Sequence, residues 1–271
     1  MRTQVRIRWV IPVSSPGGCL SMFLTFAALV AAAQVIRPTA SEMMAKLSSP
    51  EPLQRASAFV GLEKIGALSG NGAPETLLNL LDRENRLIEA TLRESASQSG
   101  VSVKYGEEYS EYYAMLLRAC WERCDRKNAR TPTVLVNSSY SPSSDFAQQL
   151  ARDHGEAILP ALFQKARSDI VGFRAEGITM LGILKLANPT LAAAESASIR
   201  SAVITATRDA SMPVRQGAVE TLGKIGTTAD IGLLTDIAKR DDAQNDYRGK
   251  TRYPVREQAE KAIESIRQRR Q

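Results

Sequence analysis

The sequence predicts an all-α protein in which antiparallel helix pairs stack side by side. The main observation is a block that recurs four times: an arginine, a small residue three positions later, an aliphatic residue four positions further on and another after three more. This spacing places the apolar side chains on one stripe of a helix. The arginines of the last three copies, Arg174, Arg215 and Arg256, are evenly spaced, which indicates an internal repeat. No segment shows convincing alternation of apolar and polar residues, so little or no strand is expected.

The clearest copy of the block covers residues 213–226, and further copies cover 53–66, 173–184 and 254–266. We expect the small residue of each copy to let a neighbouring helix approach closely. Gly66 and Gly226 are expected to end their helices in the left-handed conformation that glycine tolerates. The positions that define the repeat structurally are Arg55, Arg174, Arg215, Arg256, Ala218 and Leu222.

Each of the last three blocks follows another amphipathic helix, so the repeating unit is two helices joined by short turns. Four or five such pairs are expected over residues 42–267. Within a domain at 34–267, residues 42–100 hold the first repeats, 101–155 an irregular section and 156–267 the regular repeats. Long polar insertions are expected at 128–144 and 240–253, with the short run Thr133 to Val136 lying in a loop, and residues 268–271 form a basic tail.

This pattern resembles the HEAT repeats, in particular the short class that also occurs in phycobilisome lyase subunits. The resemblance rests on the spacing of Arg215, Ala218 and Leu222, on the preceding Asp209 and on the period of roughly 40 residues. It is strong over residues 156–266, fair over 42–81 and poor over 82–155. It implies a right-handed α-solenoid.

The resemblance also implies that the arginine at the start of each second helix pairs with an acidic residue of an adjacent turn. Asp169 and Asp209 are the candidates. A ligand-facing role for Arg174, Arg215 and Arg256 is the alternative.

Residues 1–33 have the features of a secretory signal peptide. Arg2, Arg6 and Arg8 precede an apolar run at residues 20–30, and three alanines at 31–33 offer a cleavage site before Gln34. Cleavage would make the protein periplasmic or secreted, whereas an uncleaved segment would anchor it in a membrane. Whether translation starts at Met1 or Met22 stays open.

The charge of the chain argues against a nucleic-acid partner. The formal net charge is +6, and removing the three arginines of the signal segment leaves about +3. A nucleic-acid groove needs a stronger basic excess.

Two cysteines remain after cleavage, Cys120 and Cys124, one helical turn apart. They are interpreted as small buried residues, with a strained or redox-active bridge and metal binding as alternatives. The only histidine, His154, is expected to be exposed or to cap a helix.

Motifs for catalysis are missing from the sequence: it contains no glycine-rich phosphate loop, no Gly-x-Ser-x-Gly and no His-Glu-x-x-His. We therefore expect no catalytic residue, no cofactor and no metal site. The sequence favours a non-catalytic protein-binding or scaffold module of the cell envelope. The alternatives are a bilin-lyase-like enzyme, which the resemblance suggests, and a structural subunit of an envelope assembly.

The helix around residues 109–124 and the two insertions are the expected partner-binding surface. Tyr112 and Tyr113 are adjacent and cannot both face one core, so one of them, or Tyr109, is expected to stay accessible. The alternative is that these tyrosines pack over an irregular repeat. The candidate binding residues are Tyr109, Tyr112, Tyr113, Trp121, Tyr247, Arg248, Arg252 and Tyr253.

Overall fold

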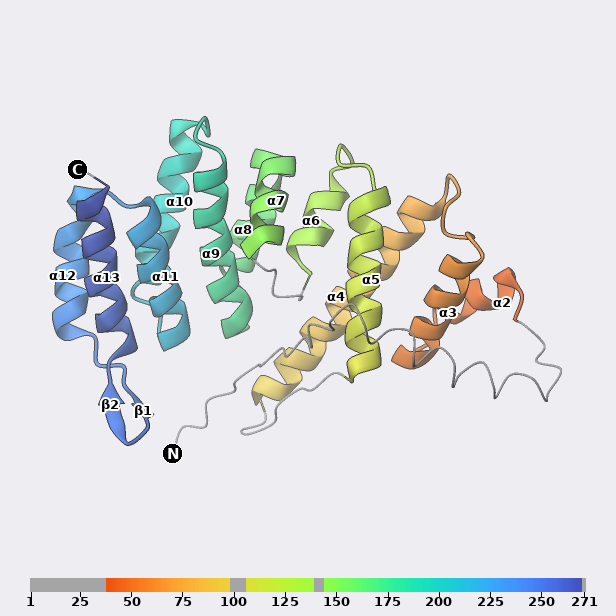
Figure 1. Ribbon diagram of the computed structural model, residues 1–271, viewed down its shortest axis with the longest axis horizontal. Coiled ribbons are helices and arrows are strands. Elements are labelled where there is room, and N and C mark those ends of the chain that lie inside the picture. Colours follow the sequence, from red (N-terminus) through yellow and green to blue (C-terminus); the bar gives the residue numbers. More distant parts are fainter. Residues whose placement is uncertain (1–37, 98–105, 139–143, 270–271) are drawn as a thin grey trace, which may run out of the picture. The chain divides into compact units, whose positions relative to one another are not determined.

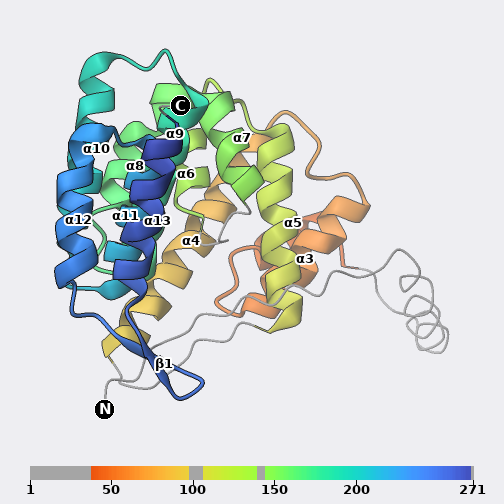
Figure 2. The same ribbon diagram turned by 60° about the vertical axis from the view of Figure 1, so that its left-hand side comes forward.

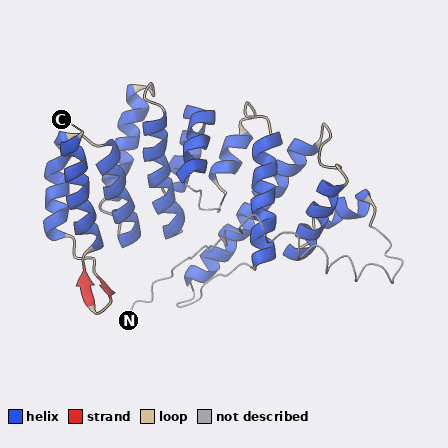
Figure 3. Ribbon diagram, viewed as in Figure 1, coloured by secondary structure: helices blue, strands red, loops and turns tan. Residues whose placement is uncertain are grey.

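The computed structural model describes residues 38–97, 106–138 and 144–269. Their regular secondary structure is helical except for one short hairpin, which Figure 3 shows in red. The prediction of an all-α protein is thus confirmed. The proposed signal peptide lies outside the described residues. So do the last two residues of the predicted tail.

The chain divides into two compact units, and α4 (Ala73–Ser97) and α5 (Glu107–Arg123) contribute to both. The first unit comprises residues 1–73 and 94–115, and the second comprises 74–93 and 116–271. The described helices that belong to the first unit alone are α2 (Ala40–Lys46) and α3 (Pro52–Lys64). The second unit contains α6 (Arg130–Val136), α7 (Ser144–His154), η1 (Gly155–Ile158), α8 (Leu159–Lys165), α9 (Val171–Ala187), α10 (Ala193–Ala206), α11 (Met212–Ile225), η2 (Thr228–Asp230), α12 (Ile231–Arg240), β1 (Asn245–Tyr247), β2 (Lys250–Arg252) and α13 (Pro254–Gln268).

In the first unit, α2 begins with a reciprocal cap. Thr39 Oγ1 accepts a hydrogen bond from the Glu42 N–H at 3.2 Å, and the Glu42 carboxylate accepts one from the Thr39 N–H at 2.7 Å. Helix α3 packs on α2 and ends before Gly66, whose φ of 70° confirms the predicted left-handed cap. The Arg55 side chain is buried and donates to the carbonyls of Ser49 and Pro50, so it fixes the turn between the two helices.

The second unit is organised around three neighbouring helices, α9, α11 and α13. Helix α11 packs against both of the others, and Figures 1 and 2 both show α12 beside α13. The helices approach closely because glycines lie at the crossings. A Cβ on Gly182 would lie 2.4 Å from Thr221 Cγ2, and one on Gly223 would lie 2.8 Å from Ala262 Cβ.

The repeat positions assigned to the core are buried as predicted. Ala218 and Leu222 have no exposed surface, and Gly177 lies so close to the backbone of Ala166 that a Cβ would clash. Gly226 departs from the prediction. Its φ is −72°, so it does not end α11 in the left-handed conformation, and a Cβ there would meet the Leu222 carbonyl oxygen at 2.4 Å. Close packing, rather than a left-handed turn, accounts for this glycine.

The insertion at 128–144 is partly helical, which corrects the prediction of an unstructured loop. The run Thr133 to Val136 belongs to α6, and its valines and Leu135 are buried. Burial overrides the strand preference of β-branched residues here. Pro132 lies in the first turn, where its missing N–H costs no intrahelical bond.

The insertion at 240–253 forms the hairpin of β1 and β2. Asn245 pairs with Arg252, and Tyr247 pairs with Lys250. Arg248 and Gly249 make the two-residue turn, and their φ values of 55° and 73° are those of a type I′ turn. Such short strands cannot produce a recognisable alternation, so the sequence pattern does not reveal them.

Candidate functional site

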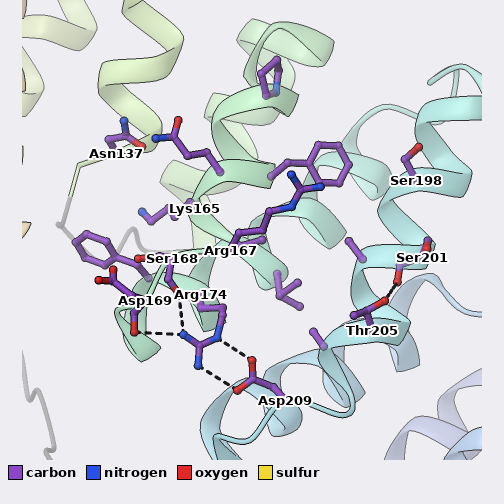
Figure 4. Close-up of a pocket in the computed structure, with 18 of the residues that line it drawn as sticks. Asn137, Lys165, Arg167, Ser168, Asp169, Arg174, Ser198, Ser201, Thr205 and Asp209 are labelled. Carbon is purple, nitrogen blue, oxygen red and sulfur yellow. Dashed lines mark hydrogen bonds and ion pairs between the residues drawn. The ribbon is translucent and has the colours of Figure 1, made fainter. Parts of the chain in front are cut away.

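A hollow of about 1440 Å³ lies in the second unit. It is lined by α8, α10 and the turns that follow them, with residues of α4 and α9 at its margins. It exists because α9 and α11 are in close contact through Gly182, whereas α8 and α10, their respective partners, do not pack extensively on each other. Helix α8 is also short, at seven residues, and leaves part of α10 uncovered. Figure 4 shows this hollow.

One wall of the hollow is held by Arg174. Its Nε donates to Asp209 Oδ2 at 2.7 Å and its Nη2 donates to Asp209 Oδ1 at 3.1 Å (Figure 4). Its Nη1 donates to the Ser168 carbonyl at 2.7 Å. The hydrogen bond to Asp209 raises the pKa of the Arg174 guanidinium. Arg174 is therefore a structural tie whose hydrogen-bonding groups are engaged within the protein.

The same tie recurs one repeat later. Arg215 Nε donates to Asp241 Oδ2 at 2.7 Å, and Arg215 Nη1 donates to the Asp209 carbonyl at 2.9 Å. The predicted pairing of the repeat arginines with acidic residues of adjacent turns is confirmed for Arg174 and Arg215. The partner is the acid that precedes the next block rather than the acid of the arginine's own turn. Arg256 differs, because it donates to the Asp241 carbonyl and stacks on the Tyr253 ring at 4.2 Å.

Lys165, which lines the hollow, belongs to a buried ion pair. Lys165 Nζ lies 2.9 Å from Glu176 Oε2, and only 2% of the lysine side chain is exposed. Lys165 also donates to the carbonyls of Val136 at 2.8 Å and Ser138 at 3.4 Å, so it joins the end of α6 to α8 and α9. Burial raises the pKa of Glu176, against the opposing effect of Lys165. Glu176 Oε1 is buried without a hydrogen-bond partner among the described residues.

At the margin of the hollow, Arg93 of α4 is fully engaged. It contacts Asp169 through Nε at 3.0 Å and Glu89 through Nη2 at 2.6 Å. The hydrogen bond from Arg93 holds the pKa of Asp169 below its ordinary value. The Arg93 and Asp169 side chains are both exposed, so their ion pair adds little to stability. It orients the turn that carries Asp169.

Two further arginines line the hollow and are unpaired within the described part of the chain. The guanidinium groups of Arg167 and Arg208 form neither a hydrogen bond nor an ion pair with any described residue, and both side chains are exposed. In Figure 4, Arg167 extends towards the side of α10 that carries Ser198, Ser201 and Thr205. Sequence interpretation missed both arginines, although their separation equals that of Arg174 and Arg215.

The structure does not bring the predicted partner-binding residues together in this hollow. Tyr109, Tyr112 and Tyr113 are all buried, so the expectation of an accessible tyrosine is wrong. Tyr112 packs edge-on against Phe59 of α3 and against Tyr109, with ring centroids 5.6 and 5.8 Å away. Both adjacent tyrosines are buried because α5 packs on more than one side. This agrees with the alternative interpretation, in which the tyrosines are packing residues.

Trp121 is half-buried and lies among Phe146, His154 and Arg126. His154 is thus half-buried against an aromatic ring and makes no capping hydrogen bond, contrary to expectation. Burial lowers the pKa of His154. Trp121 packs among these side chains, and a partner-binding role for it stays a prediction.

The remaining candidates belong to the hairpin and to the residue that follows it. Arg248 and Arg252 are exposed, and Arg252 forms an ion pair with Glu257. Tyr253 is half-buried beneath Arg256. The backbone of Tyr247 lies in β1, while its side chain is outside the described part of the structure. A partner-binding role for this hairpin stays a prediction.

Among the described residues, no group of three or more histidine, cysteine, aspartate or glutamate side chains has a geometry suited to a metal. Cys120 and Cys124 are free thiols, both buried. None of the described helices combines the length and the apolar character needed to cross a membrane. The side chains that line the hollow include cationic, hydroxyl, aromatic and carboxylate groups.

No known family model matches the chain, and a search of the curated proteins yields no significant match. The resemblance to HEAT repeats thus rests on the sequence spacing alone.

Proposed function

We propose that the protein is a non-catalytic binding module of the HEAT-like type, a right-handed solenoid of helix pairs that presents a fixed surface to a protein partner. The observation that carries the proposal is the repeated tie between successive pairs. Arg174 binds Asp209 and Arg215 binds Asp241, each through two hydrogen bonds between guanidinium and carboxylate. Solenoid repeats contact only their neighbours and are joined by such repeated interactions.

The packing of the second unit also supports a solenoid. Helix α11 lies between α9 and α13, and each of these three is paired with the helix before it in the sequence. This arrangement leaves the surface of α8 and α10 open along the hollow. A preformed concave surface lowers the cost of ordering on binding.

We further propose that the protein acts in the cell envelope after export and cleavage near Ala33. The support is the arginine-rich start and the apolar run within residues 1–33. Fractionation of the native cell, followed by N-terminal sequencing of the recovered protein, tests this. A chain that begins at Met1 and is found only in the cytoplasm would contradict export.

The binding function is tested by affinity capture from the native cell envelope followed by titration of the captured protein in purified form. A single-site isotherm with the purified partner is expected. Shortening the hairpin at residues 245–252 to a Gly-Ser link then tests whether the hairpin contributes to binding. This deletion retains Asp241 and Arg256, so the tie between repeats survives and a loss of binding is assigned to the hairpin. If no captured protein binds saturably, the binding-module proposal is wrong.

A further inference from the structure

The cations that line the hollow fall into two groups. Lys165, Arg93 and Arg174 are each committed to a carboxylate of the protein itself. Arg167 and Arg208 have no such carboxylate within the described chain. Charge in the hollow that is available to a ligand therefore comes from two guanidinium groups.

These two arginines occupy equivalent positions in successive repeats. Their separation in the sequence matches the repeat period, and each follows the first helix of its pair. The backbone geometry repeats as well: the Arg167 N–H donates to the Gln164 carbonyl at 3.1 Å, and the Arg208 N–H donates to the Thr205 carbonyl at 3.1 Å. The repeat thus places both guanidinium groups along the same hollow, one after α8 and the other after α10.

Helix α10 adds a row of hydroxyl groups to the same hollow. Ser198, Ser201 and Thr205 are exposed and share one face of the helix because they are separated by three and four positions. The hydroxyls of Ser198 and Thr205 donate to carbonyls of their own helix, which leaves their oxygens able to accept. Backbone N–H groups of a bound peptide are suitable donors to such a row.

From these observations we infer that the hollow binds an extended peptide that presents acidic side chains to Arg167 and Arg208. Arginine binds carboxylates through two parallel hydrogen bonds. The hydroxyl row of α10 can accept hydrogen bonds from the backbone of such a peptide. This inference rests on the proposed binding function and names the chemistry of its partner.

A polyphosphate or nucleic acid is a poorer match to the same surface. Glu89, Asp169 and Asp209 also line the hollow, and their carboxylates would repel a continuous row of phosphates. Discrete carboxylates placed opposite Arg167 and Arg208 avoid the acidic wall.

The test uses fluorescein-labelled Gly-Ser peptides that carry two glutamates or, in the matched peptide, two glutamines, measured by fluorescence anisotropy at low salt with the full chain. The glutamate peptide is expected to bind saturably, and its glutamine counterpart is expected not to bind. The variants Arg167→Ala and Arg208→Ala should each weaken binding of the glutamate peptide about tenfold. The matched control is Arg240→Ala, which removes an exposed arginine of α12 outside the hollow and should leave the affinity unchanged.

Circular dichroism melting of all three variants verifies that they remain folded. Equal affinity for the glutamate and glutamine peptides, or unchanged affinity in the Arg167 and Arg208 variants, would overturn the inference. Tighter binding of a phosphopeptide or a single-stranded oligonucleotide would overturn it as well. If the partner captured from the cell still binds the Arg167→Ala/Arg208→Ala double variant at full strength, the binding function stands and the hollow is not its site.

Discussion

Arg174 and Asp209 belong to successive repeats and are joined by two parallel hydrogen bonds of 2.7 and 3.1 Å. Asp209 also accepts a hydrogen bond from the Ser211 N–H at 2.8 Å, so its carboxylate orders the turn that leads into α11. The Arg174 and Asp209 side chains are 20% and 17% exposed, which places the pair between a surface and a buried salt bridge. One interaction thus fixes both the join between repeats and the start of the next helix.

Replacing Asp209 with asparagine should make the unfolding free energy less sensitive to acid. Burial raises the pKa of Asp209, but the hydrogen bonds from Arg174 and the Ser211 N–H outweigh it, and the net pKa lies below the ordinary value of 3.8. A carboxylate with a lowered pKa in the folded state stabilises the protein above its unfolded pKa, and this contribution is lost as the pH falls through the folded value. Urea denaturation of the parent between pH 6 and pH 3 should therefore show a loss of stability below about pH 4.

The Asp209→Asn variant should be less stable than the parent near neutral pH by about 1–3 kcal/mol, the cost of leaving Arg174 without its carboxylate. This difference should narrow as the pH falls below about 4, because the parent then loses the same charge. Parallel curves of unfolding free energy against pH for the two proteins would contradict the lowered pKa of Asp209.

Two glycines of α11 should respond to alanine in opposite directions. A Cβ at Gly223 would lie 2.9 Å from the Cα of Ala262, whereas the nearest atom to a Cβ at Gly217 is Thr179 Oγ1 at 3.6 Å, an ordinary contact. Alanine is favoured over glycine in a helix by about 1 kcal/mol, so Gly217→Ala should stabilise the protein by up to that amount. Gly223→Ala should destabilise it by about 1–3 kcal/mol, since it forces α11 and α13 apart. Thermal melting of both variants checks the pair, and a stabilised Gly223 variant would show that this crossing is looser than described.

How far the sequence predicts this structure depends on the kind of interaction. The stripe that contains Ala218 and Leu222 is recognisable because a helical period of apolar residues is a local pattern. The burial of Tyr112 and Tyr113 is not recognisable in this way. It depends on contacts such as that of Tyr112 with Phe59, which belongs to a helix from a distant part of the sequence. The α6 helix illustrates the same limit, because its β-branched residues are helical owing to burial.

The candidate site is predictable only in part. The arginines of the block correctly predict ion pairs with acidic residues of neighbouring turns. Arg167 and Arg208, however, repeat without any hydrophobic pattern that would mark them. Which of two arginines is paired and which is open is decided by tertiary contacts. Arg174 meets Asp209, while Arg167, in the turn just before the same helix, meets no acid of the described chain.

The two cysteines should be unreactive in the folded protein and should not form a disulfide with each other. Both thiols are buried, and Cys124 Sγ also lies 3.4 Å from the Pro74 carbonyl oxygen. The hydrogen bond between the two thiols raises the pKa of Cys120, with burial acting in the same direction, and lowers the pKa of Cys124. Labelling with a thiol reagent at neutral pH should be slow in buffer and rapid for both residues in denaturant. Native mass spectrometry after mild peroxide treatment would contradict this if it showed the loss of two hydrogens.

The Lys165–Glu176 pair should show strong coupling between its two members. Removing one partner leaves the other charge buried, so Lys165→Met or Glu176→Leu alone should cost about 3–5 kcal/mol. In Lys165→Met the cost is increased because the carbonyls of Val136 and Ser138 lose their donor. The double variant places two apolar side chains of similar volume together, and its total cost should be well below the sum of the two single costs.

The measurement is a double-mutant cycle by urea denaturation near pH 7, and Lys224→Met with Glu220→Leu serves as the matched control. That pair has a similar separation, 2.7 Å, but both side chains are about half exposed, so its coupling should fall within about 1 kcal/mol. The sign of the pH effect gives a second readout. Because burial raises the pKa of Glu176, its ionisation opposes folding, and the stability linked to it is present at low pH and declines as the pH rises through the raised value. Glu176→Leu should remove that decline. Equal coupling energies in the two pairs would instead show that Lys165 is hydrated.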